Sequence, residues 1–299
     1  MAFIYFLLFI FGLVMGSFLN VVAGRYNPER SFFESKNILG RSRCPHCGTT
    51  LRWYELIPLL SFIWLGGRCR TCRSRISWRY PLAEILAGVA TAGAVYKLAE
   101  MFYVRQVFLS GGPTAWFIIL AVVWVWIFYF FITLSFVDWR LKIIPNEING
   151  LLAAAGAGLM IWQWWYGKWG LAEGTFLGGY AAMLGGRTEV FSNHIAAGAA
   201  ALILFLIIVA VTKGKGMGMG DAKLAGALGL IFGWPDIILV VMLAFMLGAA
   251  AGIYLLTRGQ HKMSSQIPFG PFLVAAAAAV FFWGEAILGT YFGWINLFI

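Results

Sequence analysis

The stretch AWFIILAVVWVWIFYFFITLSFVD occupies residues 115–138 and decides the fold class. It runs without a charge from residue 115 to residue 137 and then ends on an aspartate, Asp138. About 20 apolar residues in a helix cross the roughly 30 Å hydrocarbon core of a bilayer. The rest of the chain has the same character, with 61% hydrophobic and 11% charged residues in 299. This composition excludes an ordinary soluble domain and predicts an all-α polytopic membrane protein.

Other apolar runs set the expected number of membrane spans. Seven runs reach or approach the required length, and a shorter one at residues 221–234 ends at Gly233-Trp234-Pro235. We therefore expect about eight transmembrane helices. The glycine-rich residues 170–185 are predicted to form a loop or a re-entrant piece. The seven runs cover residues 3–23, 82–103, 115–137, 148–165, 194–212, 236–256 and 268–283.

The distribution of Lys and Arg predicts the orientation. The first run has no basic residue before it, unlike a cleaved signal peptide, whereas Arg25 and Arg30 follow it. The positive-inside rule then places the N-terminus outside and the segment of residues 25–81 in the cytoplasm. Counting eight spans from there puts the basic loops on one side. It also puts Asp138 and Asp221 together at the cytoplasmic edge.

Both aspartates stand where a membrane protein rarely tolerates a charge. The chain has only 12 acidic residues, and Asp221 ends the phrase Gly218-Met219-Gly220-Asp221. A carboxylate at membrane depth is costly and usually belongs to a functional site. Two carboxyls that share one proton can activate water and polarise a carbonyl, as in aspartic proteases, without either being assignable as the base. Simpler roles are also open: Asp138 could pair with Arg140, and Asp221 could cap the next helix.

All four cysteines of the chain lie in the segment of residues 25–81. They form two CxxC pairs, at Cys44 and Cys47 and at Cys69 and Cys72. This spacing is typical of a structural four-thiolate Zn²⁺ site. Two disulfides or a redox CxxC are the alternatives, but a cytoplasmic location disfavours disulfides. We expect the metal to fold a small zinc-ribbon-like domain between the first two helices.

The same segment is strongly basic. Eleven of the 22 Lys and Arg lie between Arg25 and Arg79. We interpret them as positive-inside residues, with contact to anionic membrane lipids as a second role, and we do not expect nucleic-acid binding. Glu55 and Glu84 are isolated acids near this region, and we interpret them as counter-charges.

The phrase Gly218-Met219-Gly220-Asp221 resembles the GxGD signature of intramembrane aspartyl proteases. With the other phrases, it makes the chain similar to the bacterial type IV prepilin peptidases, from its first predicted span to its last. These phrases are GSFLNV at 16–21, SRCPHC at 42–47, IP at 57–58, GRCRTC at 67–72, ISWRYP at 76–81, GMGDAKL at 218–224 and IPFGP at 267–271.

The resemblance implies more than the residue spacing does. It implies a multi-pass protein of the bacterial inner membrane that removes the basic leader from prepilins and from the pseudopilins of type II secretion. It further implies N-methylation of the new N-terminus with S-adenosylmethionine. Asp138 and Asp221 would be the catalytic pair. The zinc ligands would be Cys44, Cys47, Cys69 and Cys72, in a domain linked to methylation.

The implied organisation is a first helix at residues 1–24, the zinc-binding domain at 25–81 and a peptidase domain at 82–299. Two features depart from the family pattern: Asn146 stands where an aspartate is frequent, and the stretch 168–193 is longer and richer in glycine. No glycine-rich nucleotide loop is visible, so no residue can be named for S-adenosylmethionine.

Two other classes of membrane protein could use the same residues. A transporter could relay protons or bind cations with Asp138 and Asp221, and a scaffold could recruit a partner through the zinc ribbon. However, the chain has no second copy of either aspartate phrase, as the repeated halves of a transporter would provide. A scaffold has no need for two acids at one depth.

Overall fold

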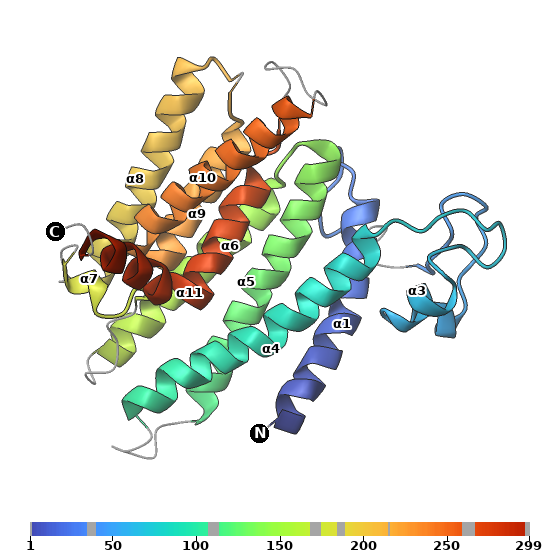
Figure 1. The fold of residues 1–299 in the computed structure, drawn as a ribbon, viewed down its shortest axis with the longest axis horizontal. Coiled ribbons are helices and arrows are strands. Elements are labelled where there is room, and N and C mark those ends of the chain that lie inside the picture. Colours follow the sequence, from blue (N-terminus) through green and yellow to red (C-terminus); the bar gives the residue numbers. More distant parts are fainter. Residues whose placement is uncertain are drawn as a thin grey trace. The chain divides into compact units, whose positions relative to one another are not determined.

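The computed structural model describes residues 2–34, 40–106, 114–167, 175–183, 189–214, 216–258 and 267–296. Within these ranges the chain is helical, and its only β-structure is two isolated bridges, Arg43 with Thr50 and Arg68 with Arg75. Figure 1 shows the helical fold, which confirms the all-α prediction. The long helices are α1 (Ala2–Arg25), α4 (Arg79–Gln106), α5 (Thr114–Leu141), α6 (Asn146–Gly167), α8 (Val190–Val211), α9 (Met219–Phe232), α10 (Asp236–Thr257) and α11 (Gly270–Asn296).

Among the described residues, six helices are long and apolar enough to cross a membrane: α1, α4, α5, α8, α10 and α11. Each matches a predicted run, so the chain is a multi-pass membrane protein. The two remaining predicted runs became α6, of 22 residues, and α9, of 14. At 1.5 Å per residue, α9 is only about 21 Å long, shorter than a bilayer core. The count of eight spans therefore stays a prediction.

The chain divides into two compact units, Met1–Val137 and Asp138–Ile299. In the first unit, glycines let α1 and α4 approach closely. A Cβ added at Gly12 would lie 2.5 Å from the Ala87 carbonyl oxygen, and one at Gly16 would lie 2.7 Å from the Glu84 Cα. Small residues at such crossings are typical of helix packing in membranes. The link to α5 is polar: the Thr91 and Tyr129 hydroxyls lie 2.8 Å apart.

In the second unit, α9 packs between α6 and α8 and is almost completely buried. A Cβ at Gly229 would lie 2.5 Å from the Gly198 Cα of α8, so the two helices touch backbone to backbone. A helix that is surrounded by protein does not need the length of a lipid-exposed span. This packing explains how a helix of 14 residues can be buried within the second unit of a membrane protein, with Asp221 in its first turn.

The far end of α9 is fixed by buried polar groups. His194 contacts the Leu230 carbonyl oxygen at 2.8 Å through Nδ1 and Gln163 Oε1 at 3.0 Å through Nε2. Asp236 accepts hydrogen bonds from the Thr175 hydroxyl, at 2.8 Å, and from the Phe176 N–H, at 3.3 Å.

These last contacts fasten part of the stretch that we predicted as a loop or re-entrant piece. Its described part holds a turn and the short helix α7 (Tyr180–Met183). The remainder, residues 168–174 and 184–188, lies outside the described residues.

Candidate active site and metal centre

Asp138 and Asp221 are both buried, with 4% and 9% of their surface exposed. Asp138 lies in the last turn of α5. The chain then turns through Lys142, at a φ of 55°, because Pro145 cannot continue the helix, and α6 begins at the next residue. Asp221 lies in the first turn of α9, where its Oδ2 accepts a hydrogen bond from the Gly218 N–H at 3.1 Å. The expectation that Asp221 is itself the cap is wrong, because Gly218 is the N-cap of α9 and Asp221, the third residue of the helix, bonds back to it.

The fold brings the two carboxyl groups together. They interact electrostatically, and the backbone N–H of Gly270 lies within hydrogen-bonding reach of both. Gly270 begins α11 and belongs to the phrase IPFGP, so a third distant segment completes the site. Asp138 Oδ2 is buried and has no hydrogen-bond partner in the described part of the protein. A buried acceptor of this kind is costly unless water or another group satisfies it.

A second set of contacts holds α9 against the start of α6. The Asn149 side chain donates from Nδ2 to the Gly220 carbonyl oxygen at 3.4 Å, and Lys223 Nζ donates to Asn146 Oδ1 at 2.7 Å. A Cβ added at Gly220 would lie only 3.0 Å from the Ile144 Cβ. These contacts fix the residue before Asp221 relative to the segment that follows Asp138.

We did not identify this bracing from the sequence. We had no reason to single out Asn149, and we noted Asn146 as a departure from the family pattern. The signal available was the spacing of the two asparagines, three residues apart and hence on one face of a helix.

The four cysteine sulfurs form a compact cluster, all within 4.8 Å of one another. Cys44 Sγ lies 3.8 Å from Cys72 Sγ, and Cys47 Sγ lies 4.0 Å from Cys69 Sγ. A disulfide needs about 2.05 Å, whereas four sulfurs at about 2.3 Å from a tetrahedral Zn²⁺ are about 3.8 Å apart. The cysteines are free, and their arrangement fits a four-thiolate metal site.

Two similar turns present these sulfurs. In the first, the Cys44 N–H donates to the Thr49 carbonyl oxygen and the Gly48 N–H donates to the Cys44 carbonyl oxygen. In the second, Cys69 and Arg73 make the equivalent bonds. The residue after each pair adopts a positive φ, 70° at Gly48 and 58° at Arg73. The candidate metal site is thus built from two copies of one local turn.

Hydrogen bonds favour the thiolate form at Cys44 and Cys72, whereas the pKa of the Cys69 thiol is raised, against its backbone hydrogen bonds, by burial and by the neighbouring Cys44 and Cys72. The backbone of Cys47, and to a smaller degree that of His46, lowers the pKa of the Cys44 thiol to about 6, against the opposing effect of burial. At Cys72, the Ser74 hydroxyl lowers the pKa of the thiol. Because metals bind the thiolate form, both shifts favour metal binding at neutral pH.

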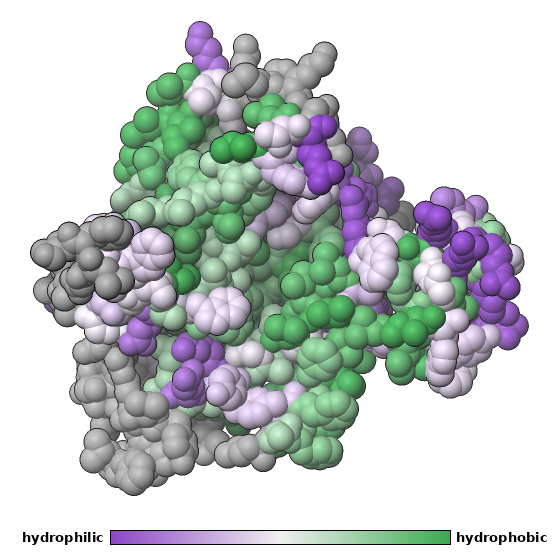
Figure 2. Space-filling model, viewed as in Figure 1, coloured by the Kyte–Doolittle hydropathy of each residue, from purple (hydrophilic) through white to green (hydrophobic). Residues whose placement is uncertain are grey.

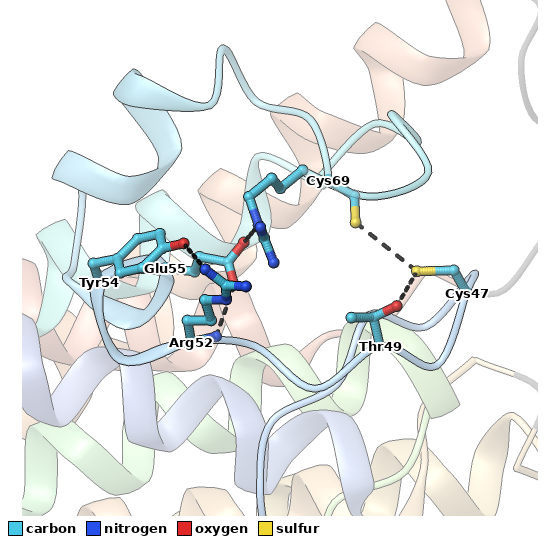
Figure 3. A network of polar contacts seen from close by, with 7 residues as sticks. Cys47, Thr49, Arg52, Tyr54, Glu55 and Cys69 are labelled. Atoms are coloured by element: carbon cyan, nitrogen blue, oxygen red, sulfur yellow. Dashed lines mark hydrogen bonds and ion pairs between the residues drawn. The ribbon is translucent and has the colours of Figure 1, made fainter.

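Glu55 fastens the second turn to the preceding segment (Figure 3). Its side chain is 4% exposed and accepts hydrogen bonds from the Arg52 N–H at 2.7 Å and from Arg70 Nε at 2.9 Å. Burial opposes ionisation, but these two donors keep the pKa of Glu55 below its usual value. The counter-charge interpretation is confirmed for Glu55. Glu84 has another role, because it accepts hydrogen bonds from the Leu59 N–H, at 2.9 Å, and from the Ser17 hydroxyl.

Together, the fold and the two sites define a multi-pass helical membrane protein with a buried acidic pair and a four-thiolate cluster. Two family models match it: "Bacterial Peptidase A24 N-terminal domain" over residues 10–98, which hold the cysteines, and "Type IV leader peptidase family" over residues 125–253, which hold both aspartates. The chain belongs to the type IV leader peptidase family.

Curated relatives match along nearly the whole length. The prepilin leader peptidase/N-methyltransferase of Burkholderia pseudomallei strain 1026b is 33% identical, over 92% of this chain and 84% of the relative. The protein of the same name from Aeromonas hydrophila is 32% identical, over 95% and 92%. That from Legionella pneumophila is 29% identical, over 98% and 96%. No solved structure matches the chain.

Proposed function

We propose that this protein removes the basic leader peptide of type IV prepilins and pseudopilins by aspartyl protease chemistry and then N-methylates the new N-terminus. The observation that carries the proposal is the buried pair of Asp138 and Asp221, which share the Gly270 N–H, in a member of this family. We infer that cleavage occurs at the cytoplasmic face of the bacterial inner membrane, with the N-terminus of the enzyme outside. Lipid surrounds the helices and holds the substrate's apolar segment beside the pair.

The chemistry follows from two adjacent carboxyls, of which one is protonated. The ionised carboxylate takes a proton from a water molecule as the water oxygen bonds to the scissile carbonyl carbon. The protonated carboxyl donates a hydrogen bond to the carbonyl oxygen, where negative charge develops. The C–N bond then breaks, and the leaving amine takes the proton that came from the water. The pair titrates as a unit, so either aspartate can hold the proton at the start.

The environment of the pair supports these roles. Asp138 Oδ2, which has no partner among the described residues, is available for a hydrogen bond to the water. The Gly270 N–H fixes the carboxyl oxygens that it reaches, and it lies at a helix N-terminus, which favours negative charge. The contacts of Asn149 and Ile144 with Gly220 keep the two aspartates in register.

The four cysteines would hold one Zn²⁺ as a structural ion. A closed four-thiolate site leaves no position for water or substrate, so the metal would stabilise the fold of its segment. S-adenosylmethionine would supply the methyl group that the new N-terminal amine accepts.

Incubation of the reconstituted protein with a membrane-inserted prepilin and methyl-labelled S-adenosylmethionine tests both activities. We expect mass spectrometry to show a product that lacks the leader and carries one added methyl group on its N-terminal amine. A cleaved but unmethylated product would restrict the function to proteolysis. An intact substrate, with enzyme that is folded and contains zinc, would contradict the proposal.

A further inference from the structure

The zinc-binding segment carries an apolar surface that neither cleavage nor metal binding uses. We call it the tryptophan face. Its three indoles are among the most exposed large hydrophobic side chains that the structure describes: Trp53 is 77% exposed, Trp64 74% and Trp78 76%. A contiguous apolar patch on a protein surface usually marks an interaction site. The face consists of Trp53, Leu56, Leu60, Ile63, Trp64 and Trp78, all exposed.

The tryptophan face is held firmly in place. Most of it lies on η1 (Trp53–Leu56) and α3 (Leu60–Trp64), two short helices of the segment. The ring of Phe62, from α3, packs on Trp78 with centroids 4.9 Å apart. The Glu84 carboxylate, from α4, accepts a hydrogen bond from the Leu59 N–H at 2.9 Å. The face is therefore anchored to the start of α4, so that the two share one orientation.

The apolar surface continues from the tryptophan face onto α4. Trp78 directly precedes α4, which is apolar and long enough to cross a membrane. Figure 2 shows that the segment's hydrophobic residues gather on the side nearest α4 and its hydrophilic residues on the opposite side. A surface continuous with a membrane span points to lipid as its occupant. The first turns of α4 expose Leu82, Ile85, Leu86 and Val89.

The charge and residue types of the segment fit the same occupant. The segment has eleven Lys and Arg between Arg25 and Arg79 but only three Glu. Its net positive charge therefore attracts anionic headgroups. Tryptophan is enriched at membrane interfaces because its ring is apolar and its N–H is polar. A basic surface beside an apolar aromatic one is also the pattern of elements that lie in the interface plane.

We propose that the tryptophan face inserts into the headgroup region of the leaflet next to α4, while the neighbouring arginines pair with anionic lipids. The zinc-binding segment is then a domain that lies in the membrane surface and whose fold is held together by its metal. A protein partner or a second copy of the chain would instead cover the face with protein. The inference rests on the membrane location and not on the peptidase activity, so failure of one does not imply failure of the other.

Fluorine NMR of the full-length protein with fluorotryptophan tests this proposal. The protein is placed in nanodiscs of phosphatidylcholine and phosphatidylglycerol, and single Trp→Phe variants assign the resonances. We expect nitroxide-labelled lipid to broaden Trp53, Trp64 and Trp78 severalfold more than an aqueous gadolinium chelate does. Trp124 is buried within its helix bundle and serves as the control that neither agent should affect.

Two results would overturn the proposal. Broadening of the three indoles by the gadolinium chelate and not by the labelled lipid would place them in water. Protection from both agents would mean that protein covers the face.

The role of charge is tested separately with nanodiscs that lack phosphatidylglycerol. We expect a severalfold loss of the lipid-induced broadening there, and unchanged broadening would remove anionic lipid from the proposal. The variant Trp64→Glu should also lose the effect while it retains its zinc, since the Trp64 side chain is 74% exposed and the four proposed ligands are all cysteines.

Discussion

The two candidate sites are built in opposite ways. The cysteine cluster comes from two copies of one local turn, each closed by hydrogen bonds over five residues. The acidic pair instead needs the end of α5, the start of α9 and the start of α11, which are far apart in the sequence. The sulfurs face one another, whereas Asp138 retains a buried oxygen without a described partner. In a site that only stabilises a fold, every polar or ligand atom can be satisfied within the site. A site that acts on a substrate needs at least one group that is available to bind it.

The largest effect should come from neutralising the acidic pair. Asp138→Asn or Asp221→Asn removes the group that must lose or donate a proton, so we expect leader cleavage to fall by about 10³-fold or more. The zinc content should stay at that of the unmodified protein, because the cysteines lie in the other unit. A quantitative assay of prepilin processing, with elemental analysis of the same preparation, measures both. Processing at the normal rate in either variant would eliminate the catalytic assignment.

Removing zinc ligands should separate the two activities. In Cys44→Ser with Cys72→Ser, two of four thiolates are gone, and we expect the zinc content to fall from about one ion per chain to none. Methylation should be lost while cleavage persists within severalfold, because in our proposal cleavage uses Asp138, Asp221 and their neighbours and not the cysteines. All four cysteines belong to the cluster, so no cysteine is left for a control variant. His46→Ala, which alters a residue between two proposed ligands, serves as the control and should retain zinc. Equal loss of both activities would mean that the two sites are not independent.

A smaller effect should come from the bracing of α9. Asn149→Leu removes the side-chain hydrogen bond to the Gly220 carbonyl oxygen, and we expect this to loosen the register of Asp221. Since small misplacements of catalytic groups are costly, we expect kcat for cleavage to fall by about 10- to 100-fold. The KM should change little if Asn149 acts only through the backbone that precedes Asp221, as its contact with Gly220 indicates.

Lys223→Met is the matched control on the same face. It removes an exposed hydrogen bond to Asn146, which contributes less than about 1 kcal/mol. We expect no more than a severalfold change in kcat. Equal effects of Asn149→Leu and Lys223→Met would argue against a specific role of the Gly220 contact.

The sequence was informative where function depends on local spacing or on a residue in an unusual environment. The two CxxC pairs predicted the sulfur cluster, because a short turn fixes two ligands at a time. The aspartates could be singled out because a charge beside a long apolar run is rare.

Contacts between distant segments could not be predicted in this way. Nothing in the phrase IPFGP indicates that the Gly270 N–H reaches both aspartates. The contact of Asn149 with Gly220 depends on how α6 packs against α9. Likewise, an apolar run of 14 residues cannot reveal by itself that protein rather than lipid surrounds α9.

The smallest predicted effect lies within the cysteine cluster, at the position that follows the second cysteine of each turn. In both turns the residue after the second cysteine has a positive φ. Gly48 adopts this left-handed conformation without strain, whereas Arg73 is strained by it. A non-glycine residue in this conformation costs about 1–2 kcal/mol, and the greater freedom of glycine in the unfolded chain cancels part of that. Arg73→Gly should therefore stabilise the metal-bound turn by about 0.5–1 kcal/mol, since the Arg73 side chain is exposed.

The rate of zinc transfer to a chelator measures this difference. We expect Arg73→Gly to slow the transfer severalfold, and the reciprocal Gly48→Arg to accelerate it, because a Cβ at Gly48 meets open space and only the backbone is strained. If the two variants change the rate of zinc transfer in opposite directions, the two turns have equivalent conformations. They then differ only in how well each residue tolerates the left-handed backbone. Acceleration by Arg73→Gly would instead assign a stabilising role to the arginine side chain itself.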